Sequence, residues 1–430
     1  MHLNSTPLVF FRKSLDQWGL NLVALSVLGF TFLYIRTTFV PTVIVVLCSL
    51  CFVVDQQFRR RCVAVFSNAE SKWIAWLFLG WFISDLLLRL IHLDTVVFSF
   101  PENEFRFLIA ITLLALPVKP ATKKIFWISL LVASVGSALD VAYEWVFFFD
   151  DFQRVSGTTN NQIHFGNLSA LVMLLCITFS FLAEHTSVKH RLVYLGAALL
   201  ALFAALASGS RSSAIVFVCL VPLLLLANKD HWQRRLSKLA AAFFIVSLTA
   251  IALVPQVQEK LRLQEFSSDV ERMAHNDYVS SVGARVAMWR TAWMLFEQHP
   301  VAGVGLGKFE GEIVKRVKEG KIPATEIYGQ PHSDLMHAAS SGGLIKLSAY
   351  IAMMLGSFLY FYKKYMRLRD NHLERIIPVM GMQVVAAYFL FGLTNSNFDL
   401  QIYSMTFATL MCLFAAICEN AVTATAPSTP

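Results

Sequence analysis

Charged side chains are scarce in this 430-residue chain. They make up 15% of it, whereas a soluble protein carries about 25%. Hydrophobic residues reach 56%, and the mean hydropathy is +0.58. Repeated apolar runs of roughly 17 to 22 residues are long enough to cross a bilayer core of about 30 Å as helices. The composition therefore argues against a soluble globular protein and predicts an all-α polytopic membrane protein.

Basic residues are nearly absent from one side of the predicted topology. Twenty Lys and Arg residues of the short loops fall on one side of the membrane, and four fall on the other. Because short cytoplasmic loops carry the excess of Lys and Arg, the first side is expected to be cytoplasmic. The net charge of +8 is then mostly a topology signal. No basic patch interleaved with stacking aromatics is found, so nucleic-acid binding is not expected.

Cysteine is absent from the loops on the exterior side. All seven cysteines lie in predicted spans or near their cytoplasmic ends, so no disulfide framework is expected outside. Cys48-x-x-Cys51 lies within an apolar helix without a partner pair and is interpreted as packing. The N-terminus also lacks a cleavage site of the A-x-A kind: the basic pair Arg12–Lys13 precedes a full-length span. We therefore expect no cleaved signal peptide.

The apolar runs predict about twelve membrane-spanning helices, with both termini on the cytoplasmic side. Their ranges are 19–35, 38–55, 73–92, 104–118, 125–149, 164–184, 192–208, 212–227, 239–255, 343–362, 376–395 and 401–418. The predicted organisation is one integral membrane domain: helices one to nine in 1–255, a large exterior helical loop in 256–342, three further helices in 343–418 and a cytoplasmic tail in 419–430.

The loop between spans nine and ten is roughly 85 residues long, well beyond ordinary connections, and such loops are often functional. The segment "DYVSSVGARVAMWRTAWMLFEQHP" (277–300) predicts one helix in this loop. Arg285 stands four residues before Trp289, so the two lie on the same side of that helix. The segment that follows, "HPVAGVGLGKF" (299–309), has a glycine at every second position. Without a preceding strand it is a weak phosphate-loop signal, and we interpret it as a tight turn. The loop is predicted to be a cap of helices on the membrane mouth.

Ionisable residues inside membrane spans are costly, so each is a functional candidate. Asp85 and Arg89 stand four apart and could also be a pair that only neutralises itself. Lys346 lies near the start of span ten. Asp140 and Glu144 put two like charges on one helix face, which requires a cation or a basic partner. All of them fall in the exterior half of their helices.

Arg211 lies in the small-residue turn "ASGSRSSAIVF" (207–217) at the exterior lip of two apolar helices. An isolated arginine there could simply extend to the interface. The flanking serines and glycine add hydroxyl groups and flexible backbone, which favours binding of an anion.

Two histidines follow in "YGQPHSDLMHAASSGGLIKLSAY" (328–350). Five helical residues rotate by about 500°, so His332 and His337 would point about 140° apart on a helix. That spacing argues against a metal pair. A histidine pKa near neutrality suits a general base instead. We predict this role for His332, whereas His337 is as compatible with core packing as with function.

These residues resemble those of the bacterial O-antigen ligases, in the O-antigen ligase/polymerase superfamily. His332-Ser333, nine further residues and then Gly343 are similar to the family's H-[N/S/Q]-x9-G motif, and Lys346 stands where a glycine is usual. The turn around Arg211, the helix with Arg285 and the segment "HPVAGVGLG" are similar to its other marked positions. The resemblance covers essentially the whole chain.

The resemblance implies a GT-C-like, metal-independent, cofactor-free glycosyltransferase at the periplasmic face of the bacterial inner membrane. It implies transfer of a glycan from undecaprenyl diphosphate to a sugar hydroxyl of lipid A–core, which completes lipopolysaccharide. His332 would be the catalytic base, and Arg211 and Arg285 would bind the diphosphate; His337, Lys346 and Arg89 are weaker candidates.

Other members of the superfamily polymerise O-antigen repeats or glycosylate proteins, and these alternatives stay open. A twelve-helix transporter is a distant alternative, because carriers of that kind show two similar six-helix halves. No such halves are visible here, and the long loop is exterior and late in the chain.

Overall fold

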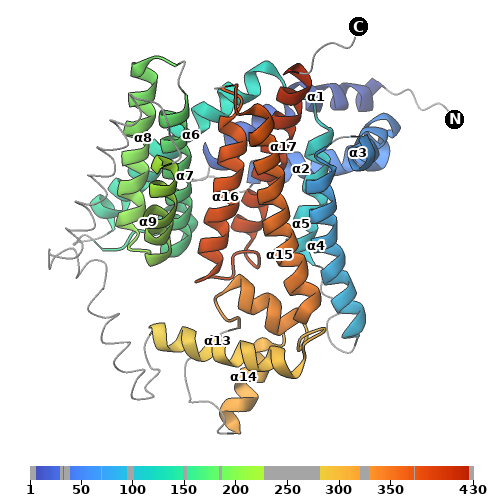
Figure 1. The fold of residues 1–430 in the computed structure, drawn as a ribbon, viewed down its shortest axis with the longest axis vertical. Coiled ribbons are helices and arrows are strands. Elements are labelled where there is room, and N and C mark those ends of the chain that lie inside the picture. Colours follow the sequence, from blue (N-terminus) through green and yellow to red (C-terminus); the bar gives the residue numbers. More distant parts are fainter. Residues whose placement is uncertain are drawn as a thin grey trace.

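The structure is a computed structural model and describes residues 6–29, 32, 39–68, 70–93, 101–148, 153–183, 186–226, 281–319, 329–371 and 373–425. Within these ranges it is helical and contains no strand. The helices (Figure 1) are α1 (Thr6–Gly29), α2 (Phe39–Val54), α3 (Gln56–Asn68), α4 (Lys72–Ile91), α5 (Glu102–Ala110), η1 (Ile111–Ala115), α6 (Pro120–Phe147), η2 (Gly157–Thr159), α7 (Gln162–Leu182), α8 (Val188–Ala207), α9 (Arg211–Leu226), α13 (Ser281–Gln298), α14 (Phe309–Lys318), α15 (Asp334–Leu368), α16 (Ile376–Gly392) and α17 (Gln401–Thr425).

Six of the described helices are long and apolar enough to cross a membrane: α4, α6, α7, α8, α15 and α17. The pair α2 and α3, bent by 106°, would make a seventh. Two shorter apolar helices, Arg211–Leu220 and Ile376–Gly392, coincide with predicted spans. The prediction of an all-α polytopic membrane protein is confirmed at this level. The count of about twelve stays a prediction, because the expected span 239–255 lies outside the described residues.

The predicted span 104–118 is wrong as a single spanning helix. The chain forms the nine-residue helix α5 and then the five-residue 3₁₀ helix η1. Leu116 is extended, at φ −83° and ψ 139°, because it precedes Pro117 and proline disfavours the helical conformation in the residue before it. The two pieces are too short to match the other spans, and α5 instead holds polar residues against α4.

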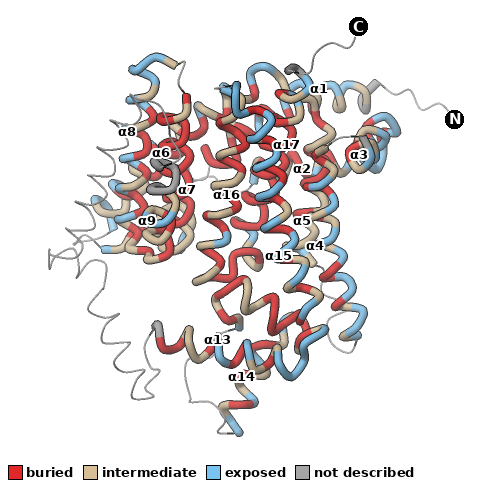
Figure 2. Tube along the Cα trace, viewed as in Figure 1, coloured by how far each residue is buried: buried red, intermediate tan, exposed pale blue. Residues whose placement is uncertain are grey.

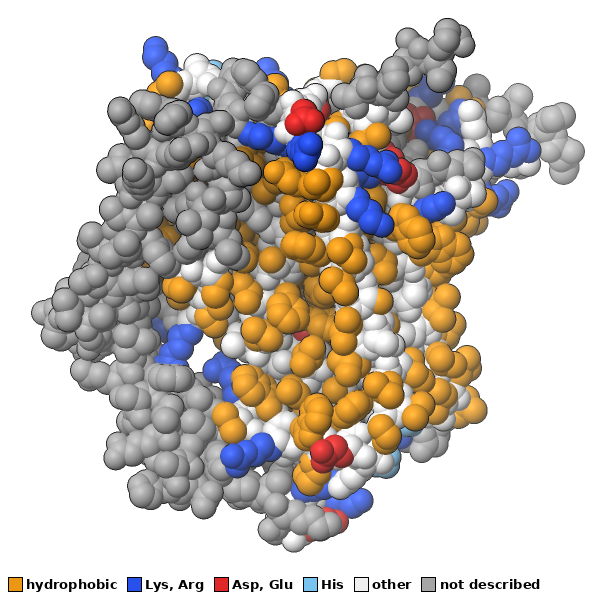
Figure 3. Space-filling view, in the orientation of Figure 1, with side chains coloured by type: hydrophobic (Ala, Val, Ile, Leu, Met, Phe, Trp, Pro, Cys, Tyr) orange, Lys and Arg blue, Asp and Glu red, His pale blue; other side chains and the backbone are white. Residues whose placement is uncertain are grey.

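The apolar helices form two groups, which are joined through α16 and through α1. Helix α6 (teal) and the green helices α7 to α9 form one, and α15 to α17 with α4 and α5 form the other (Figure 1). Helices α7 and α17 are buried along most of their length, at 89% and 83% of their most apolar windows (Figure 2). Hydrophobic side chains cover the middle of the face in Figure 3, and Lys and Arg gather near its upper end. This band is typical of a protein surface in contact with lipid.

Helices α13 and α14 lie at one end of the molecule, opposite the start of α1 and the end of α17 (Figure 1). They have a small core of their own, separate from the main one, which consists of Ala284, Met288, Ala292, Leu295, Phe309 and Ile313. The predicted helix within 277–300 is therefore confirmed as α13. Its two tryptophans are not in this core, and Trp293 is 50% exposed.

Helix α15 contains a break at Gly343, where φ is 58° and ψ is −152°. The turn after α13 docks at this break through four backbone hydrogen bonds. Val304 and Gly305 donate to the carbonyls of Ser340 and Ser341, at 2.9 and 3.0 Å, and Leu344 and Ile345 donate to those of Pro300 and Val301, at 2.7 and 3.2 Å.

Glycine is required on both sides of this junction. A Cβ at Gly303 would lie 2.4 Å from the carbonyl carbon of Ser341, and one at Gly343 would lie 2.5 Å from Val301. Both glycines also have positive φ, which other residues rarely adopt. The glycine-rich segment is thus a tight turn that holds α13 against α15, as its sequence predicts.

Candidate functional site

The segment that carries His332 lies between α13 and the start of α15. His332 has a left-handed backbone, with φ 47°, and therefore stands outside the helix that begins at Asp334. Just before it, the carbonyl oxygen of Pro331 accepts a hydrogen bond of 3.0 Å from the indole Nε1 of Trp289. Helix α13 thus fixes the position of the residue before the predicted base.

The structure brings Arg285 and His332 together. Burial of the half-buried imidazole lowers the pKa of His332, and the charge of the nearby Arg285 guanidinium lowers it further. Both effects disfavour the charged form. His332 is therefore neutral at pH 7, which is the protonation state that a general base needs.

Asn395 also contacts His332. This contact was not predicted from the sequence. Its side chain forms a hydrogen bond with the imidazole that raises the pKa of His332, which opposes the two larger effects. The Nδ2 of Asn395 donates to Oδ1 of Asn397, at 3.2 Å, and Nδ2 of Asn397 donates to Oδ2 of Asp334, at 3.1 Å. Because this hydrogen bond raises the pKa, it favours the protonated ring, so the Oδ1 of Asn395 is the atom that accepts an N–H from His332.

Asp334 is the buried end of this series of hydrogen bonds, with 6% of the residue exposed. Its Oδ1 also accepts the backbone N–H of Phe398, at 3.2 Å. The carboxylate therefore ties the first turn of α15 to the connection between α16 and α17. His332 and Asp334, two residues apart in the sequence, thus stand at the two ends of one polar network.

Arg211 is the first residue of α9, in the other group of helices. The serines around it are buried and bonded within the protein: Ser212 Oγ donates to Oδ1 of Asn167, at 2.5 Å, and contacts Ser210 Oγ, at 2.9 Å. Asn167 in turn donates from Nδ2 to the hydroxyl of Tyr403, at 3.0 Å. The hydroxyls fix the shape of the turn, so any role in binding an anion falls to Arg211 and the helix N-terminus. Arg211 is not among the groups that shift the pKa of His332.

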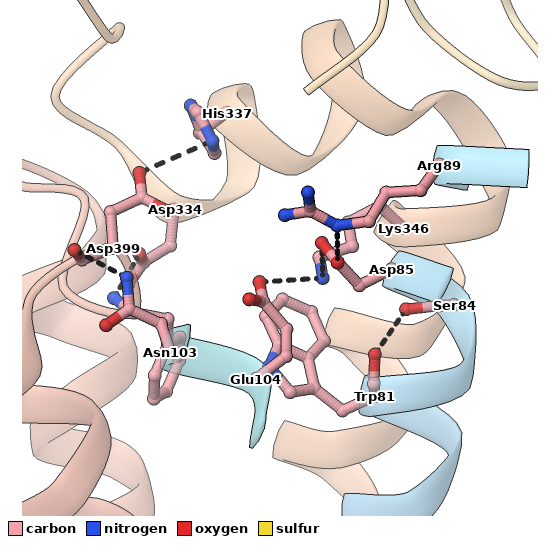
Figure 4. A network of polar contacts seen from close by, with 11 residues as sticks. Trp81, Ser84, Asp85, Arg89, Asn103, Glu104, Asp334, His337, Lys346 and Asp399 are labelled. Carbon is pink, nitrogen blue, oxygen red and sulfur yellow. Dashed lines mark hydrogen bonds and ion pairs between the residues drawn. The ribbon is translucent and has the colours of Figure 1, made fainter. Parts of the chain in front are cut away.

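His337 lies on the first turn of α15, and its Nε2 is 3.3 Å from Oδ2 of Asp399 (Figure 4). It faces a cavity of about 420 Å³ that is also lined by Arg89 and Lys346. The predicted pair of Asp85 and Arg89 is present, with 2.6 Å between Oδ2 and Nε. Lys346 lies 3.4 Å from Asp85 and 3.0 Å from Glu104, so these side chains form one network across α4, α5 and α15.

The two like charges on α6 are accounted for by the polypeptide itself. Glu144 accepts the backbone N–H of Ser156, at 3.0 Å, and Asp140 accepts that of Thr158, at 3.5 Å. Both carboxylates therefore hold the turn before α7. Across the described ranges, no group of three or more His, Cys, Asp and Glu side chains is arranged to hold a metal ion.

Asn103, Asp334, Asn395 and Asp399 were not predicted from sequence. A signal was present for two of them: "TNSNFDL" (394–400) is a polar run between two apolar helices, at the same end as the predicted exterior residues. Polar groups at such a position are candidates in the same way as charges within spans.

Comparison with known proteins bears on this site. Residues 196–351 match the family model described as O-antigen ligase. The match supports membership of the O-antigen ligase/polymerase superfamily, whose members are glycosyltransferase-like enzymes. The matched residues include Arg211, Arg285 and His332.

The chain is also similar to an uncharacterized protein of Haemophilus influenzae. It is 26% identical over 342 residues, which cover 77% of this chain and 82% of that protein. The similarity therefore extends well beyond residues 196–351, although this relative contributes no substrate or reaction.

Proposed function

We propose that the chain is an O-antigen ligase: an inverting, metal-independent glycosyltransferase that moves a glycan from undecaprenyl diphosphate to a sugar hydroxyl of lipid A–core. It would act at the periplasmic face of the inner membrane, with both termini cytoplasmic. The observation that carries the proposal is that Arg285 lies near enough to His332 for its charge to lower the pKa of the imidazole, both residues falling in the range that matches the O-antigen ligase family model. A neutral base beside a fixed cation suits transfer from a diphosphate.

His332 is the base in this scheme. It takes the proton of the acceptor hydroxyl while that oxygen attacks the anomeric carbon of the donor sugar. The bond from this carbon to the diphosphate oxygen breaks, and undecaprenyl diphosphate leaves with the electron pair. Attack opposite the leaving group inverts the anomeric carbon. The proton on His332 then passes to water, which restores the neutral imidazole.

Arg211 and Arg285 stabilise the departing diphosphate. Its negative charge grows as the bond breaks, and guanidinium groups bind phosphate oxygens in a bidentate manner with a permanent charge. Charge stabilisation of this kind is worth about 10² to 10³ in rate for each donor. The charge of Arg285 adds to burial in lowering the pKa of His332, which favours the neutral imidazole.

Asn395 orients His332. With its Oδ1 accepting one N–H of the imidazole, the lone pair of the base lies on the other ring nitrogen. The chain through Asn397 to Asp334 fixes the amide and thereby the ring. Asn395 is a positioning residue, since it acts on the substrate only through His332.

The test is glycan transfer in a ligase-deficient cell by variants expressed at the wild-type level. His332→Ala is expected to lower transfer about 10² to 10⁴-fold, the range for positioned proton transfer, and Arg211→Ala and Arg285→Ala about 10² to 10³-fold. Near-normal transfer by His332→Ala would end the general-base role. Arg290→Ala is a matched control, because this exposed arginine lies on the same helix as Arg285.

Removal of divalent cations tests the part assigned to the arginines. Purified protein is expected to keep full activity in excess chelator, since Arg211 and Arg285 supply the charge that a cation would otherwise provide. Loss of activity that added metal restores would contradict this scheme. Lipid A–core, repeat-unit lipid and a pilin-like protein offered as competing acceptors distinguish a ligase from a polymerase or a protein glycosyltransferase.

A further inference from the structure

The cavity of about 420 Å³ has no part in the proposed chemistry, yet it lies along the segment that carries His332. Gln330, Asp334 and His337 line it, and these residues stand on either side of His332 in the chain. Its volume is within the range of about 300 to 1,000 Å³ that ligand pockets have. A ligand in this cavity would therefore be a neighbour of the reacting groups.

Three aromatic rings line the cavity. The ring centroids of Trp81, Tyr350 and Phe398 lie 6.0 to 6.5 Å apart. Trp81 is only 4% exposed, and its indole N–H has no hydrogen-bond partner in the part of the chain that the structure describes. All three rings are nearly fully buried, so they shape the cavity wall and offer little ring surface to a ligand.

The charged side chains of the cavity are mainly carboxylates. Its two cations, Arg89 and Lys346, are already paired with Asp85 and Glu104 within the cavity wall (Figure 4). Beyond these pairs the lining adds the carboxylates of Asp399 and of Glu102, which lies 3.5 Å from Arg106, whereas Asp334 is buried and hydrogen-bonded within the protein. The excess negative charge disfavours a phosphate or another anion and favours a neutral or cationic ligand.

Hydrogen-bonding groups stand at the edge of the cavity. Asp399 is held from two sides: its backbone oxygen accepts from Nδ2 of Asn103, at 2.8 Å, and its Oδ2 lies 3.3 Å from Nε2 of His337. Its side chain is 34% exposed, so its carboxylate remains accessible. A fixed and accessible carboxylate acceptor suits recognition of the hydroxyl groups of a sugar.

We infer that this cavity binds one sugar unit, neutral or amino-substituted, of a glycan whose adjoining unit lies at His332. The inference rests on the proposed glycosyl transfer and adds a subsite to it. The sugar could belong to the donor glycan or to the acceptor core, since both are oligosaccharides. The two arginines would then bind the charged diphosphate, and this cavity would bind the uncharged sugar.

The isosteric variants Glu102→Gln and Asp399→Asn test the inference by steady-state kinetics on the full chain. Hydrogen bonds to charged groups contribute about 1.5 to 3 kcal/mol, so KM is expected to rise about tenfold or more for one substrate, with kcat within about twofold. A rise for lipid A–core assigns the subsite to the acceptor, and a rise for the donor lipid assigns it to the donor. Unchanged KM values for both substrates would overturn the inference.

Asp370→Asn is the matched control, because Asp370 is a 92% exposed carboxylate in the turn after α15. Its KM values are expected to equal those of the wild type. A Tm within about a degree of wild type for all three variants shows that the substitutions leave the fold intact.

Binding to the His332→Ala protein separates this subsite from the proposed function. The probes are lipid-free, dephosphorylated core oligosaccharide and free repeat-unit oligosaccharide, measured by calorimetry in detergent. One probe is expected to bind, about tenfold more weakly when Asp399→Asn is added, and more weakly when the probe is phosphorylated. This result would support the subsite even if wild-type protein transferred no glycan. Binding of neither probe, or equal binding with and without Asp399→Asn, would overturn the subsite while leaving the transfer reaction intact.

Discussion

The indole Nε1 of Trp289 donates a hydrogen bond to the carbonyl oxygen of Pro331, at 3.0 Å. This bond connects α13 to the residue before His332. Because Arg285 lies one helical turn before Trp289, the same helix face supplies a cation that acts on His332 and the donor that holds its backbone. One helix thus sets both the charge and the position of the predicted base.

Replacement of Trp289 by phenylalanine keeps most of the ring and removes this donor. A hydrogen bond contributes about 0.5 to 1.5 kcal/mol, so kcat is expected to fall about twofold to tenfold as His332 loses its position. Trp293→Phe is the control, since Trp293 is 50% exposed and its Nε1 bonds Glu297 on the surface. Equal activity of the two variants would contradict the positioning role of Trp289.

Two variants are expected to move the acidic limb of the pH profile in opposite directions. The base must be neutral, so kcat/KM falls as the pH drops through the pKa of His332, which lies below its ordinary value of 6.5. Arg285→Gln removes a charge that lowers this pKa, so the limb shifts to higher pH. Asn395→Ala removes a hydrogen bond that raises it, so the limb shifts to lower pH.

The measurement is kcat/KM against pH, normalised for each variant to its own maximum. Shifts in the same direction, or none in either variant, would contradict the assignment of the limb to His332. A variant that only perturbs folding changes the height of the profile and leaves the limb in place.

Gly343→Ala is expected to destabilise the protein. Its φ of 58° and ψ of −152° lie in a region that only glycine populates readily, and the new Cβ would meet the backbone of Val301 at 2.5 Å. Strain of about 1 to 3 kcal/mol is expected from the conformation alone. Gly311→Ala on α14 is the matched control, since nothing lies within 4 Å of its Cβ position. Thermal unfolding in detergent compares the two, and an unchanged Tm for Gly343→Ala would refute the strain.

Tyr403→Phe is expected to disturb the turn of Arg211 from a distance. It leaves Nδ2 of Asn167 without its acceptor in a fully buried site, at a cost of about 1 to 3 kcal/mol. Asn167 also holds Ser212, the neighbour of Arg211, so KM for the donor lipid should rise as well. Tyr362→Phe is the control, because Tyr362 is 46% exposed on α15. A donor KM equal to that of the control would show that Asn167 does not position Arg211.

Much of the fold is readable from apolar periodicity, because a helix in a bilayer needs a long apolar run with all backbone groups paired internally. The same logic places Arg285 and Trp289 on one face of α13. It fails at 104–118, where the length of the run is right but Pro117 ends the helix at Leu116. The domain boundaries and the sidedness of the membrane stay predictions.

The site is less predictable, because its contacts join loops far apart in the chain. Asn395 meets His332 across more than sixty residues, through a left-handed backbone at His332 that no periodicity indicates. The serines around Arg211 illustrate the opposite failure. Their composition favours binding of an anion. In the structure, however, their buried hydroxyls are hydrogen-bonded to Asn167 and to each other.

The four backbone hydrogen bonds at Gly343 have a consequence for how substrates are admitted. They hold the turn after α13 to both halves of α15, so the segments that carry Arg285 and His332 are fixed to each other. Arg211 begins α9 and takes no part in these bonds. A donor's diphosphate bound by Arg211 and Arg285 would therefore join two separate parts of the fold, and its length would have to match the distance between them.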